Sequence, residues 1–552
     1  MVNISNQEAT WLPGYVQDKL KSNLSEYLGL TTVADPKVEA TLKKLQKESE
    51  SSARDENTAL QLGKLTTAKY VLFVKIRKVG NGYAMSTDFT DCTTGEQLAS
   101  ATSKVYKKVE DLYSIAGAID ELTIAIANKL NIELSDTDIS ILRTGSADFA
   151  GRLGGGKITL WAFTDELETM VNTYYKPTHP KMDVDIKMFN TNEMVSKLEN
   201  AFANGNSVPD VFTLEDAFVR KIIEKGDSQL LDLTNVYEEV SEKMIKYPSE
   251  IGTYQNKVYG LSWQVTPGAI FYRRSLAKKY LGTDDPVLVQ ACLSNWNEFN
   301  KTAMTLKEKS EGKCVILSSP HSAYRVYKDN RKQPWVVKGK LNIDPAIKEF
   351  MKNTKALKEN GCIADAGQWN DQWFAGMRGD LKDYNGNNIE VFSYFLPTWG
   401  LHYVLKTNAP TTFGDWAVVP GPASYHWGGT WVAAYKNTKH PEEVKEFIKY
   451  ITSDDVFLEM YAKTTGDVVS NNTVIAKIKD NFSEKFLNGQ NHYEVFADLA
   501  NKINGTLIQD TDQAIDNIFM DVYANEYIYG KKNGPQTLDI FKKRVKAELG
   551  IN

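Results

Sequence analysis

Hydrophobic and polar residues between positions 156 and 220 follow two alternating periodicities. Short apolar runs, typical of buried strands, alternate with segments whose apolar residues have helical spacing. The expected order is a strand at 158–163, a helix, a strand carrying Val184, Ile186 and Met188, a helix to residue 204, and a short strand ending at 213–216. This β-α-β-α-β order predicts a parallel sheet. Polar turns at Asp165-Glu166 and Glu215-Asp216 follow its strands, where such sheets bind ligands in a crevice.

The first 134 residues predict a separate and smaller α/β unit. Helices are expected at 12–28, 35–50, 58–64 and 113–130, and strands at 31–33, from residue 70, at 83–90 and up to residue 103. Glycine-containing turns at 80–82 and 93–95 separate the last three strands. Val2-Asn3-Ile4 also has the composition of a strand.

A segment of small and polar residues separates this unit from the rest of the chain. Residues 135–156 are rich in glycine, which favours a linker. A chain of 552 residues is also too long for one hydrophobic core. We therefore expect an α/β domain at 1–134, a linker at 135–156 and a larger domain at 157–552.

Composition narrows the partners and the compartment. The net charge is −5, so neither nucleic acid nor an anionic membrane surface is an expected partner. The sequence contains no run of about 18 apolar residues that would predict a membrane-spanning helix. The N-terminus does not resemble a signal peptide, which leaves a cytoplasmic protein or a mature chain whose signal is replaced by Met1. The strand-like Val2-Asn3-Ile4 favours the second interpretation.

The sequence shows no motif for metal, cofactor or nucleophilic chemistry. Its six histidines lack HxH or HExxH spacing, and no GxSxG motif occurs. The four cysteines form no CxxC pair. We expect them to be free buried thiols, although a disulfide such as Cys314–Cys362 stays open. We expect no metal, no cofactor and no catalytic residue.

Seven longer motifs occur one after another from residue 156 onward. They are GKITLWAF, GLSWQ, GAIFYRR, SLAKKYLG, NWNEFNKTAMTLKEK, NIEVFSYFLPTW and GPASYHWGGTWVAAYKNTKHPEEVKEFIKYITS. Together they resemble the family 1 extracellular solute-binding proteins of sugar ABC importers. Trp369, Trp373 and Gly376 match the W-x-x-x-F-x-x-G helix of that family, with Trp373 in place of its phenylalanine.

This resemblance implies an α/β fold of the two-lobed periplasmic-binding-protein type (type II), with hinge segments near 261–274 and 397–430. It also implies an extracytoplasmic lipoprotein that delivers a sugar to an ABC permease, with its anchor attached through a removed N-terminal signal. Trp399, after Leu396-Pro397-Thr398, occupies a position that resembles a stacking tryptophan of maltose-type binders.

The N-terminal unit carries a second, looser resemblance. The stretch ALQLGKLTTAKYVLFVKIRKVGNGYAMSTDFTDCTTGEQLASA contains an LGKL-x3-KY entry to a strand and a D-x3-TGE turn. It resembles the N-terminal TolB and CsgG-like domains of envelope proteins. The resemblance implies a docking module for an envelope partner, and a plain structural spacer is the alternative.

Ten of the eleven tryptophans lie beyond residue 160, and this bias points to a sugar ligand. An indole stacks on the apolar face of a sugar ring, while carboxylates and amides hydrogen-bond its hydroxyl groups. The candidate ligand-binding residues are Trp161, Asp165, Glu215, Asp216, Trp263, Gln264, Trp335, Trp369, Trp399, Trp427, Gly428 and Gly429. The glycines would let a ligand approach the backbone. Core packing is the alternative for each tryptophan. Helix capping is the alternative for the polar turns, by Thr164 or Asp165 at the first helix and by Asp216 at the next.

The expected function is a carbohydrate-binding receptor and not an enzyme. A sugar sensor that signals to an envelope partner through the N-terminal domain is one alternative. A glycan-cleaving enzyme is the other, and it needs two carboxylates on either side of the scissile bond. Glu215 and Asp216 are adjacent, so in a strand they point to opposite faces, which argues against that pair.

Overall fold

A computed structural model describes residues 2–4, 19–25, 27–31, 56–108, 112, 117–144, 156–179, 182–205 and 207–552. The chain divides into two compact units. One comprises residues 1–158 and 164–185, and the other comprises residues 159–163 and 186–552. Within the described ranges, no helix is long and apolar enough to cross a membrane.

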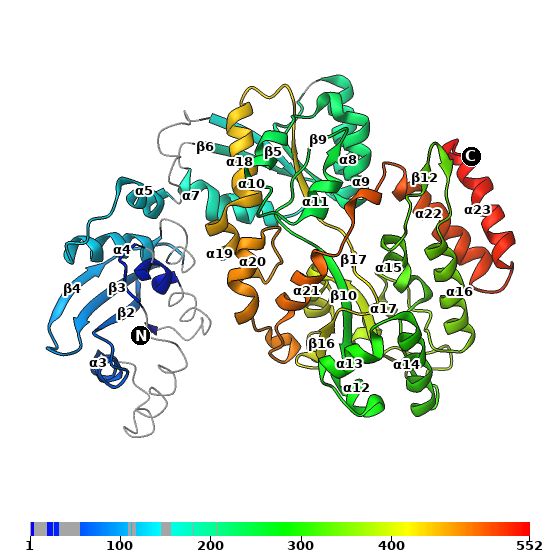
Figure 1. Cartoon of the computed structure of the whole chain (residues 1–552), viewed down its shortest axis with the longest axis horizontal. Helices are drawn as coiled ribbons and strands as arrows, with labels where there is room; N and C mark the ends of the chain where they lie inside the picture. Colours follow the sequence, from blue (N-terminus) through cyan, green and yellow to red (C-terminus); the bar gives the residue numbers. More distant parts are fainter. Residues whose placement is uncertain are drawn as a thin grey trace. The chain divides into compact units, whose positions relative to one another are not determined.

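The first unit is built on a four-stranded sheet with the order β1-β2-β3-β4 (Figure 1). The strands are β1 (Val2–Ile4), β2 (Tyr70–Val79), β3 (Gly82–Asp91) and β4 (Gln97–Thr102). Strand β1 runs parallel to β2, and the other neighbours are antiparallel. The predicted meander and the strand at Val2-Asn3-Ile4 are therefore confirmed.

Helix α4 (Ala118–Lys129) packs on this sheet and closes its core. Ile119 and Leu122 of the helix lie against Val74, Ile76 and Met85 of the strands. Helix α3 (Glu56–Leu65) confirms the helix predicted at 58–64. The helix predicted at 35–50 and most of the strand at 31–33 lie outside the described residues.

Residues 19–25, within the helix predicted at 12–28, are also helical, and four more helical segments follow α4 in the described part of this unit. Helix α5 (Asp136–Thr144) occupies the start of the predicted linker, whose residues 145–155 lie outside the described ranges. The segment after β5 is helical throughout, as α6 (Glu166–Thr169), the π-helix η2 (Met170–Tyr175) and α7 (Lys176–Thr178).

The second unit contains most of a four-stranded sheet with the strand order β18-β7-β5-β6. Its strands are β5 (Gly156–Ala162), β6 (Met182–Met188), β7 (Val211–Glu215) and β18 (Thr430–Ala434). Strands β5 and β7 are parallel, and β18 returns antiparallel from a distant part of the sequence. Helix α8 (Thr191–Asn204) ends at Gly205, whose φ of 63° gives the left-handed cap that glycine favours. The predicted β-α-β-α-β order is confirmed.

A second sheet in the same unit is centred on β10 (Pro267–Arg273). This strand pairs antiparallel with β15 (Ser393–Pro397), β16 (Trp416–Val419) and β17 (Tyr425–His426). Apart from the half-buried Arg273, the side chains of β10 are buried. The continuous apolar run of this strand in the sequence reflects that burial.

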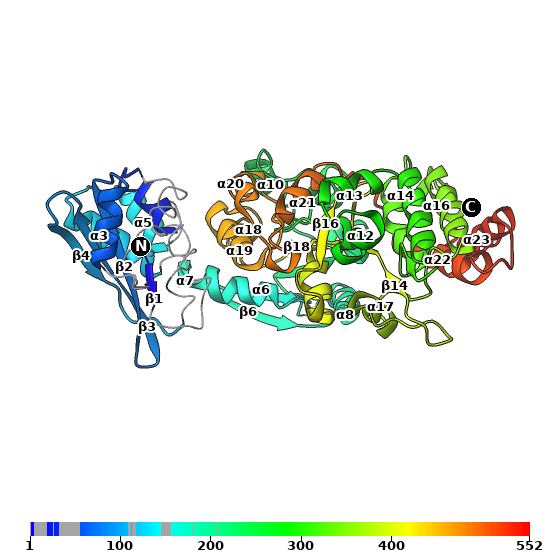
Figure 2. The same cartoon turned by 90° about the horizontal axis from the view of Figure 1, so that it is seen from below.

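Helices and short strands surround the two sheets. The helices are α9 (Asp216–Gly226), α10 (Thr234–Val240), α11 (Lys246–Ile251), α12 (Arg274–Leu281), α13 (Pro286–Leu293), α14 (Trp296–Lys309), α15 (Tyr324–Asp329), α16 (Pro345–Glu359), α17 (Asp371–Arg378), α18 (Pro441–Ser453), α19 (Asp455–Thr465), α20 (Asn472–Ile478), α21 (His492–Ala500), α22 (Asp512–Val522) and α23 (Gly534–Leu549). The short strands are β8 (Thr253–Tyr254), β9 (Lys257–Val258), β11 (Cys314–Val315), β12 (Val336–Val337), β13 (Lys340–Leu341) and β14 (Glu390–Val391). The two views show α16, α22 and α23 gathered at one end of this unit (Figures 1 and 2).

The chain passes between the two sheets beside β10. Leu261 forms a bridge to Val432 of the first sheet, and β10 then belongs to the second. On the return, β17 pairs with β10, and β18 enters the first sheet after three intervening residues. The two passages are joined by hydrogen bonds, because the amide of Trp427 donates to the carbonyl of Thr266 at 3.1 Å and the Thr266 hydroxyl donates to the carbonyl of Gly428 at 2.7 Å.

The four cysteines are free, and all except the half-buried Cys292 are buried. This agrees with the expected thiol state and gives no support to a bridge between Cys314 and Cys362.

Candidate ligand-binding site

Three tryptophans from separate parts of the sequence form one cluster at the passage between the sheets. The rings of Trp369 and Trp399 are nearly parallel, with centroids 6.0 Å apart and an interplanar angle of 13°. Trp427 meets both rings edge-on, at 6.2 Å and 5.3 Å. These distances lie in the range where aromatic rings attract one another.

The backbone of each segment fixes its indole. Trp399 follows β15 and opens the π-helix η5 (Gly400–Lys406), and its Nε1 donates to the carbonyl of Trp427 at 2.8 Å. Trp369 precedes Asn370, the N-cap of α17, and its φ of 67° is left-handed, a strained conformation for a bulky side chain. The Trp369 side chain is 55% exposed, so it presents an open apolar surface.

Arg325 of α15 covers Trp427. Its guanidinium lies 4.4 Å from the centre of the indole ring, in cation–π geometry. Trp427 is only 6% exposed as a result of this contact and those with the other tryptophans. We conclude that Trp427 supports the cluster, whereas Trp369 and the half-buried Trp399 carry its accessible surface.

Glu215 and Asp216 lie where β7 ends and α9 begins. Glu215 is the N-cap of the helix, and its Oε2 accepts from the amide of Ala217 at 2.8 Å. The cap of this helix was expected at Asp216, and the structure places it one residue earlier, at Glu215. Asp216 is the first helical residue, and its Oδ1 lies 3.1 Å from Nε2 of His426.

His426 stands between two carboxylates from different parts of the unit. Its Nε2 faces Asp216 of α9, and its Nδ1 lies 2.7 Å from Oδ2 of Asp329 at the end of α15. The backbone amide of His426 also donates to Asp329, at 2.7 Å. Because β17 carries His426 beside the passage between the sheets, this cluster joins α9 next to the first sheet to α15 next to the second.

Mutual charge stabilisation dominates the titration of this cluster. Burial alone would lower the pKa of His426, but the charges of Asp329 and Asp216 raise it to about 10. Burial alone would raise the pKa of Asp329, yet the charge of His426 lowers it to about 2. Asp216 likewise has a lowered pKa, because His426 outweighs its burial. His426 is therefore an imidazolium at neutral pH.

The pKa of Glu215 shifts in the opposite direction to that of Asp216. Burial, followed by the charge of Asp216, raises the pKa of Glu215 to about 7, so its carboxyl group is partly protonated at neutral pH. In that state it both donates and accepts hydrogen bonds.

Two predicted tryptophans and one predicted amide belong to the core. Trp263 and Trp335 have no exposed surface, and the Nε1 of Trp335 donates to Asp516 at 2.8 Å. Gln264 is 6% exposed, and its Nε2 donates to Thr430 at 3.1 Å. The expectation that these three side chains face a ligand is corrected: each lies beside a chain crossing or a loop, but neighbouring elements pack over it.

The two glycines make room for protein side chains. A Cβ at Gly428 would lie 3.1 Å from Nε1 of Trp399, and a Cβ at Gly429 would lie 3.1 Å from the ring of Trp431. Their φ values of 73° and 128° also disfavour other residues. On the side where a Cβ would stand, the space beside these glycines is therefore taken by the two indoles.

Trp161 lies near the end of β5, and Asp165 follows that strand. Trp161 is half-buried, with its ring 5.0 Å from that of Phe189 in an edge-on contact. Asp165 is exposed and precedes α6 without a side-chain capping bond. Helix capping by the Asp165 carboxylate is therefore not observed.

Arg325, Asp329 and His426 were missed by the sequence reasoning. His426 matches no metal or catalytic spacing, so the sequence carries no signal for its role. Arg325 and Asp329 lie four residues apart on one short helix, and their common face becomes visible only once α15 is seen to pack against β17. In the described part of the chain, no group of three or more His, Cys, Asp or Glu side chains is arranged to hold a metal ion.

Comparison with known proteins places this architecture in a family. The model of the bacterial extracellular solute-binding proteins matches residues 169–486. The arabinooligosaccharide-binding protein of Bacillus subtilis is 22% identical over 417 residues, which are 71% of this chain and 92% of that protein. The chain therefore belongs to the bacterial extracellular solute-binding proteins.

Solved structures show the same fold. A crystal structure of an extracellular solute-binding protein of family 1 gives a TM-score of 0.63 at 18% identity, covering 71% of this chain and 99% of the other. The ABC transporter-associated binding protein of Bifidobacterium animalis subsp. lactis, in complex with β-1,6-galactobiose, gives 0.55 at 21% identity, covering 71% and 97%. These similarities confirm the expected α/β fold of periplasmic binding proteins.

Proposed function

We propose that this chain is the extracytoplasmic receptor of an ABC importer and that its ligand is a sugar or an oligosaccharide. The observation that carries the proposal is the exposed indole of Trp369 beside Trp399, within a cluster that also holds Arg325. The name of the Bacillus subtilis relative and the galactobiose bound in one similar structure support a carbohydrate ligand.

The indoles, Arg325 and Glu215 each have a role in this proposal. The indoles of Trp369 and Trp399 stack on the C–H face of a sugar ring. The guanidinium of Arg325 forms no hydrogen bond or ion pair with the described residues, so its N–H groups are free to donate to sugar hydroxyls. Glu215 exchanges hydrogen bonds with hydroxyl groups, and Trp161 and Asp165 stay candidates on the sequence argument alone.

Asp216 acts indirectly in this scheme. Its carboxylate is paired with His426, so it positions the N-terminus of α9 and contacts no sugar. Ligand contacts that form in only one arrangement of the two sheets and their helices would drive closure about the 261–274 and 397–430 segments. The closed receptor would then hand the sugar to a membrane permease.

Isothermal titration calorimetry against arabino-, galacto- and malto-oligosaccharides tests the ligand class. Saturable heat with at least one series is expected, together with chromatograms in which the oligosaccharide keeps its length. Shortened products would instead indicate a glycan-cleaving enzyme. Binding of a peptide or an inorganic ion, with no heat from any sugar, would contradict the proposal.

We also propose that the N-terminal unit docks an envelope partner and that the protein is lipid-anchored near the membrane. The support is the resemblance to TolB and CsgG-like domains and the separate sheet β1-β2-β3-β4. Pull-down from an envelope extract with and without sugar would separate docking from sensing. A partner retained only with sugar present would favour the sensor, and no retained partner would contradict docking.

A further inference from the structure

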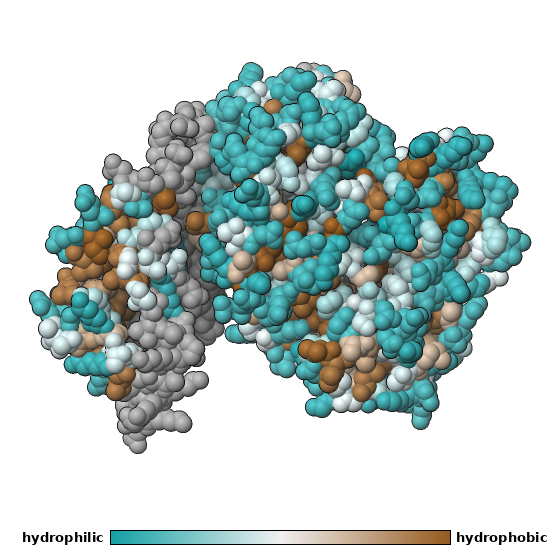
Figure 3. Space-filling model, in the orientation of Figure 1, coloured by the Kyte–Doolittle hydropathy of each residue, from teal (hydrophilic) through white to brown (hydrophobic). Residues whose placement is uncertain are grey.

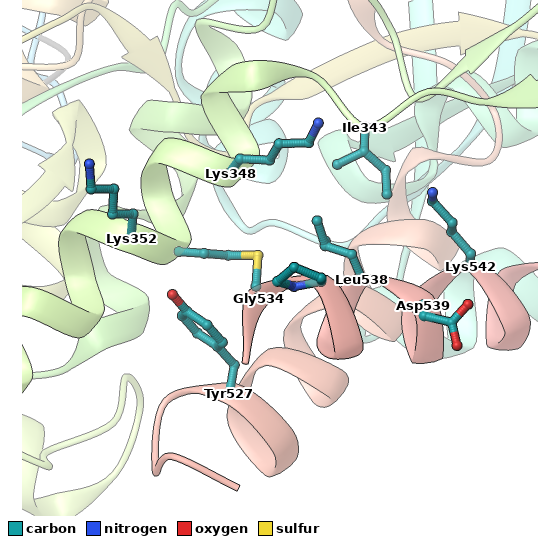
Figure 4. Close-up of a pocket in the computed structure, with 10 residues that line it drawn as sticks. Ile343, Lys348, Lys352, Tyr527, Gly534, Leu538, Asp539 and Lys542 are labelled. Atoms are coloured by element: carbon teal, nitrogen blue, oxygen red, sulfur yellow. The ribbon is translucent and has the colours of Figure 1, made fainter. Parts of the chain in front are cut away.

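An open cavity of about 650 Å³ lies in the second unit, between helices α16 and α23. Its lining side chains come from both helices and from the segments beside them (Figure 4). No residue of the tryptophan cluster or of the His426 cluster lines it. It is therefore a separate feature from the proposed sugar site.

The floor of this groove is apolar. Met351 of α16 and Leu538 and Pro535 of α23 line the cavity together with Tyr527, and Leu538 and Tyr527 are labelled in the close-up (Figure 4). Apolar surface is also visible near the C-terminal helices in the space-filling view (Figure 3). A floor of this kind binds apolar side chains by removing them from water.

The rim of the groove is basic. Lys348 and Lys352 stand on α16, and Lys542 stands on α23 across the cavity. All three are exposed, and none forms an ion pair with any residue in the described ranges. The one acidic lining residue, Asp539, is already paired with Lys543 at 2.8 Å. The groove therefore keeps its positive charge although the whole chain carries −5.

We propose that this groove docks an acidic amphipathic helix of a protein partner. Lys348 and Lys352 are one turn apart, so their positions on α16 differ by about 6 Å along the axis. Acidic residues four apart on a docked helix have the same spacing and can face both ammonium groups. Apolar residues between them enter the floor at Met351 and Leu538, as in other helix-in-groove interfaces.

This inference does not rest on the proposed sugar site, because no group is shared between the two. Charge complementarity decides the choice of occupant, since unpaired ammonium groups attract carboxylates and speed encounter. A basic or neutral helix would leave the three lysines uncompensated.

Fluorescence anisotropy tests the proposal with the full chain and a synthetic labelled peptide. The peptide is helical, with leucine along one face and glutamate at i and i+4 on its flanks, and a second version replaces each glutamate by glutamine. Saturable binding of the glutamate peptide is expected. The combined variant K348E/K352E/K542E should weaken it about tenfold or more, because three exposed charge pairs are lost.

A matched variant controls for net charge. Lys278, Lys309 and Lys439 are exposed residues of the same unit outside the groove. The variant K278E/K309E/K439E should change peptide affinity less than about threefold, since screening limits distant charges. Leu538→Gln should weaken peptide binding because it removes apolar surface from the floor and leaves the lysines unchanged. Sugar titrations should be unchanged in all three variants.

Several results would overturn the proposal. One is equal weakening by the groove and control triples, and another is equal binding of the glutamine peptide. Failure of the glutamate peptide to bind would also reject it. Binding of phosphatidylglycerol vesicles in place of the peptide, with the same lysine dependence, would assign the groove to an anionic lipid surface.

Discussion

The second unit uses its charged groups in opposite ways in two regions. Around His426, Asp216 and Asp329 lie within 3.1 Å of the imidazole, and Lys328 lies 3.2 Å from Asp516. In the α16–α23 groove, Lys348, Lys352 and Lys542 have no such partners among the described residues. The first region uses its charges to hold protein segments together, and the second leaves them for something outside the chain.

The difference between paired and unpaired charges indicates which kind of ligand each region can bind. A buried and mutually paired cluster is costly to disturb and offers few free hydrogen-bonding groups. The proposed sugar site therefore uses the neighbouring indoles and Arg325, and not the paired charges, to bind an uncharged ligand. Unpaired surface charge costs little to keep and favours an oppositely charged partner.

The largest expected effect is the loss of the imidazolium. His426→Ala leaves Asp216 and Asp329 buried without their shared cation, which should lower the free energy of unfolding by about 3–5 kcal/mol. Urea denaturation measures this difference. His440→Ala removes a more exposed imidazole and should change stability by less than about 0.5 kcal/mol.

The same group predicts a pH dependence. Its pKa of about 10 in the folded protein exceeds the ordinary value of 6.5, so its stabilisation is complete below pH 6.5 and is lost as pH rises toward 10. His426→Ala should not show this part of the fall in the free energy of unfolding between pH 6.5 and pH 10. Parallel stability curves for wild type and variant over this range would contradict the assignment.

Trp399→Ala should have the next largest effect. It removes a stacking surface and the hydrogen bond to the Trp427 carbonyl, so the affinity for the sugar identified by calorimetry should fall about 30- to 100-fold. Tyr384→Ala, at a 97% exposed aromatic residue outside the cluster, is the matched control and should leave affinity unchanged. An unchanged affinity in Trp399→Ala would remove this indole from the site.

Trp369→Gly separates ligand binding from stability. Glycine adopts the φ of 67° without strain, and this relief offsets the loss of ring contacts, so stability should change by no more than about 1 kcal/mol. Its sugar affinity should nevertheless fall about tenfold, because a 55% exposed indole is lost. Thermal unfolding and calorimetry on the same samples measure both quantities, and a large loss of stability would show that Trp369 is structural.

Glu215→Gln gives the smallest and most specific effect. The pKa of Glu215 is raised from 4.5 to about 7, so the folded state binds this proton more tightly and loses stability as pH rises from 4.5 through 7. The variant should gain on the order of 1 kcal/mol relative to wild type between pH 5 and pH 8, with allowance for solvent screening. Urea midpoints measure this gain, and exposed Glu494→Gln is the control. Equal midpoint shifts in both variants would contradict the prediction.

Local sequence patterns were enough to predict the secondary-structure elements and the family. The alternating periodicities located β5, α8 and β7, and the glycine turns located the β2-β3-β4 meander, because both signals arise within a few residues. The motif order from GKITLWAF to the PEEVKEFIKYITS helix indicated a solute-binding protein, and the family match confirms it.

The site was only partly predictable. Trp399 and Trp369 were named as candidates from their turns, and the structure brings their rings together. Trp263 and Trp335 occupy similar turns in the sequence, yet both are fully buried. The sequence around a tryptophan is the same whether or not a distant helix covers its indole. Sequence position could therefore not separate Trp369 and Trp399 from the buried Trp263 and Trp335.

The sequence by itself therefore determined the α/β elements, their order and the concentration of indoles beyond residue 160. Tertiary structure alone decided which charges are neutralised. It places α9, α15 and β17 around His426 and leaves the lysines of the α16–α23 groove unpaired. The physical reason is that burial and electrostatic pairing depend on distances in space between residues up to 210 positions apart, and no local pattern encodes them.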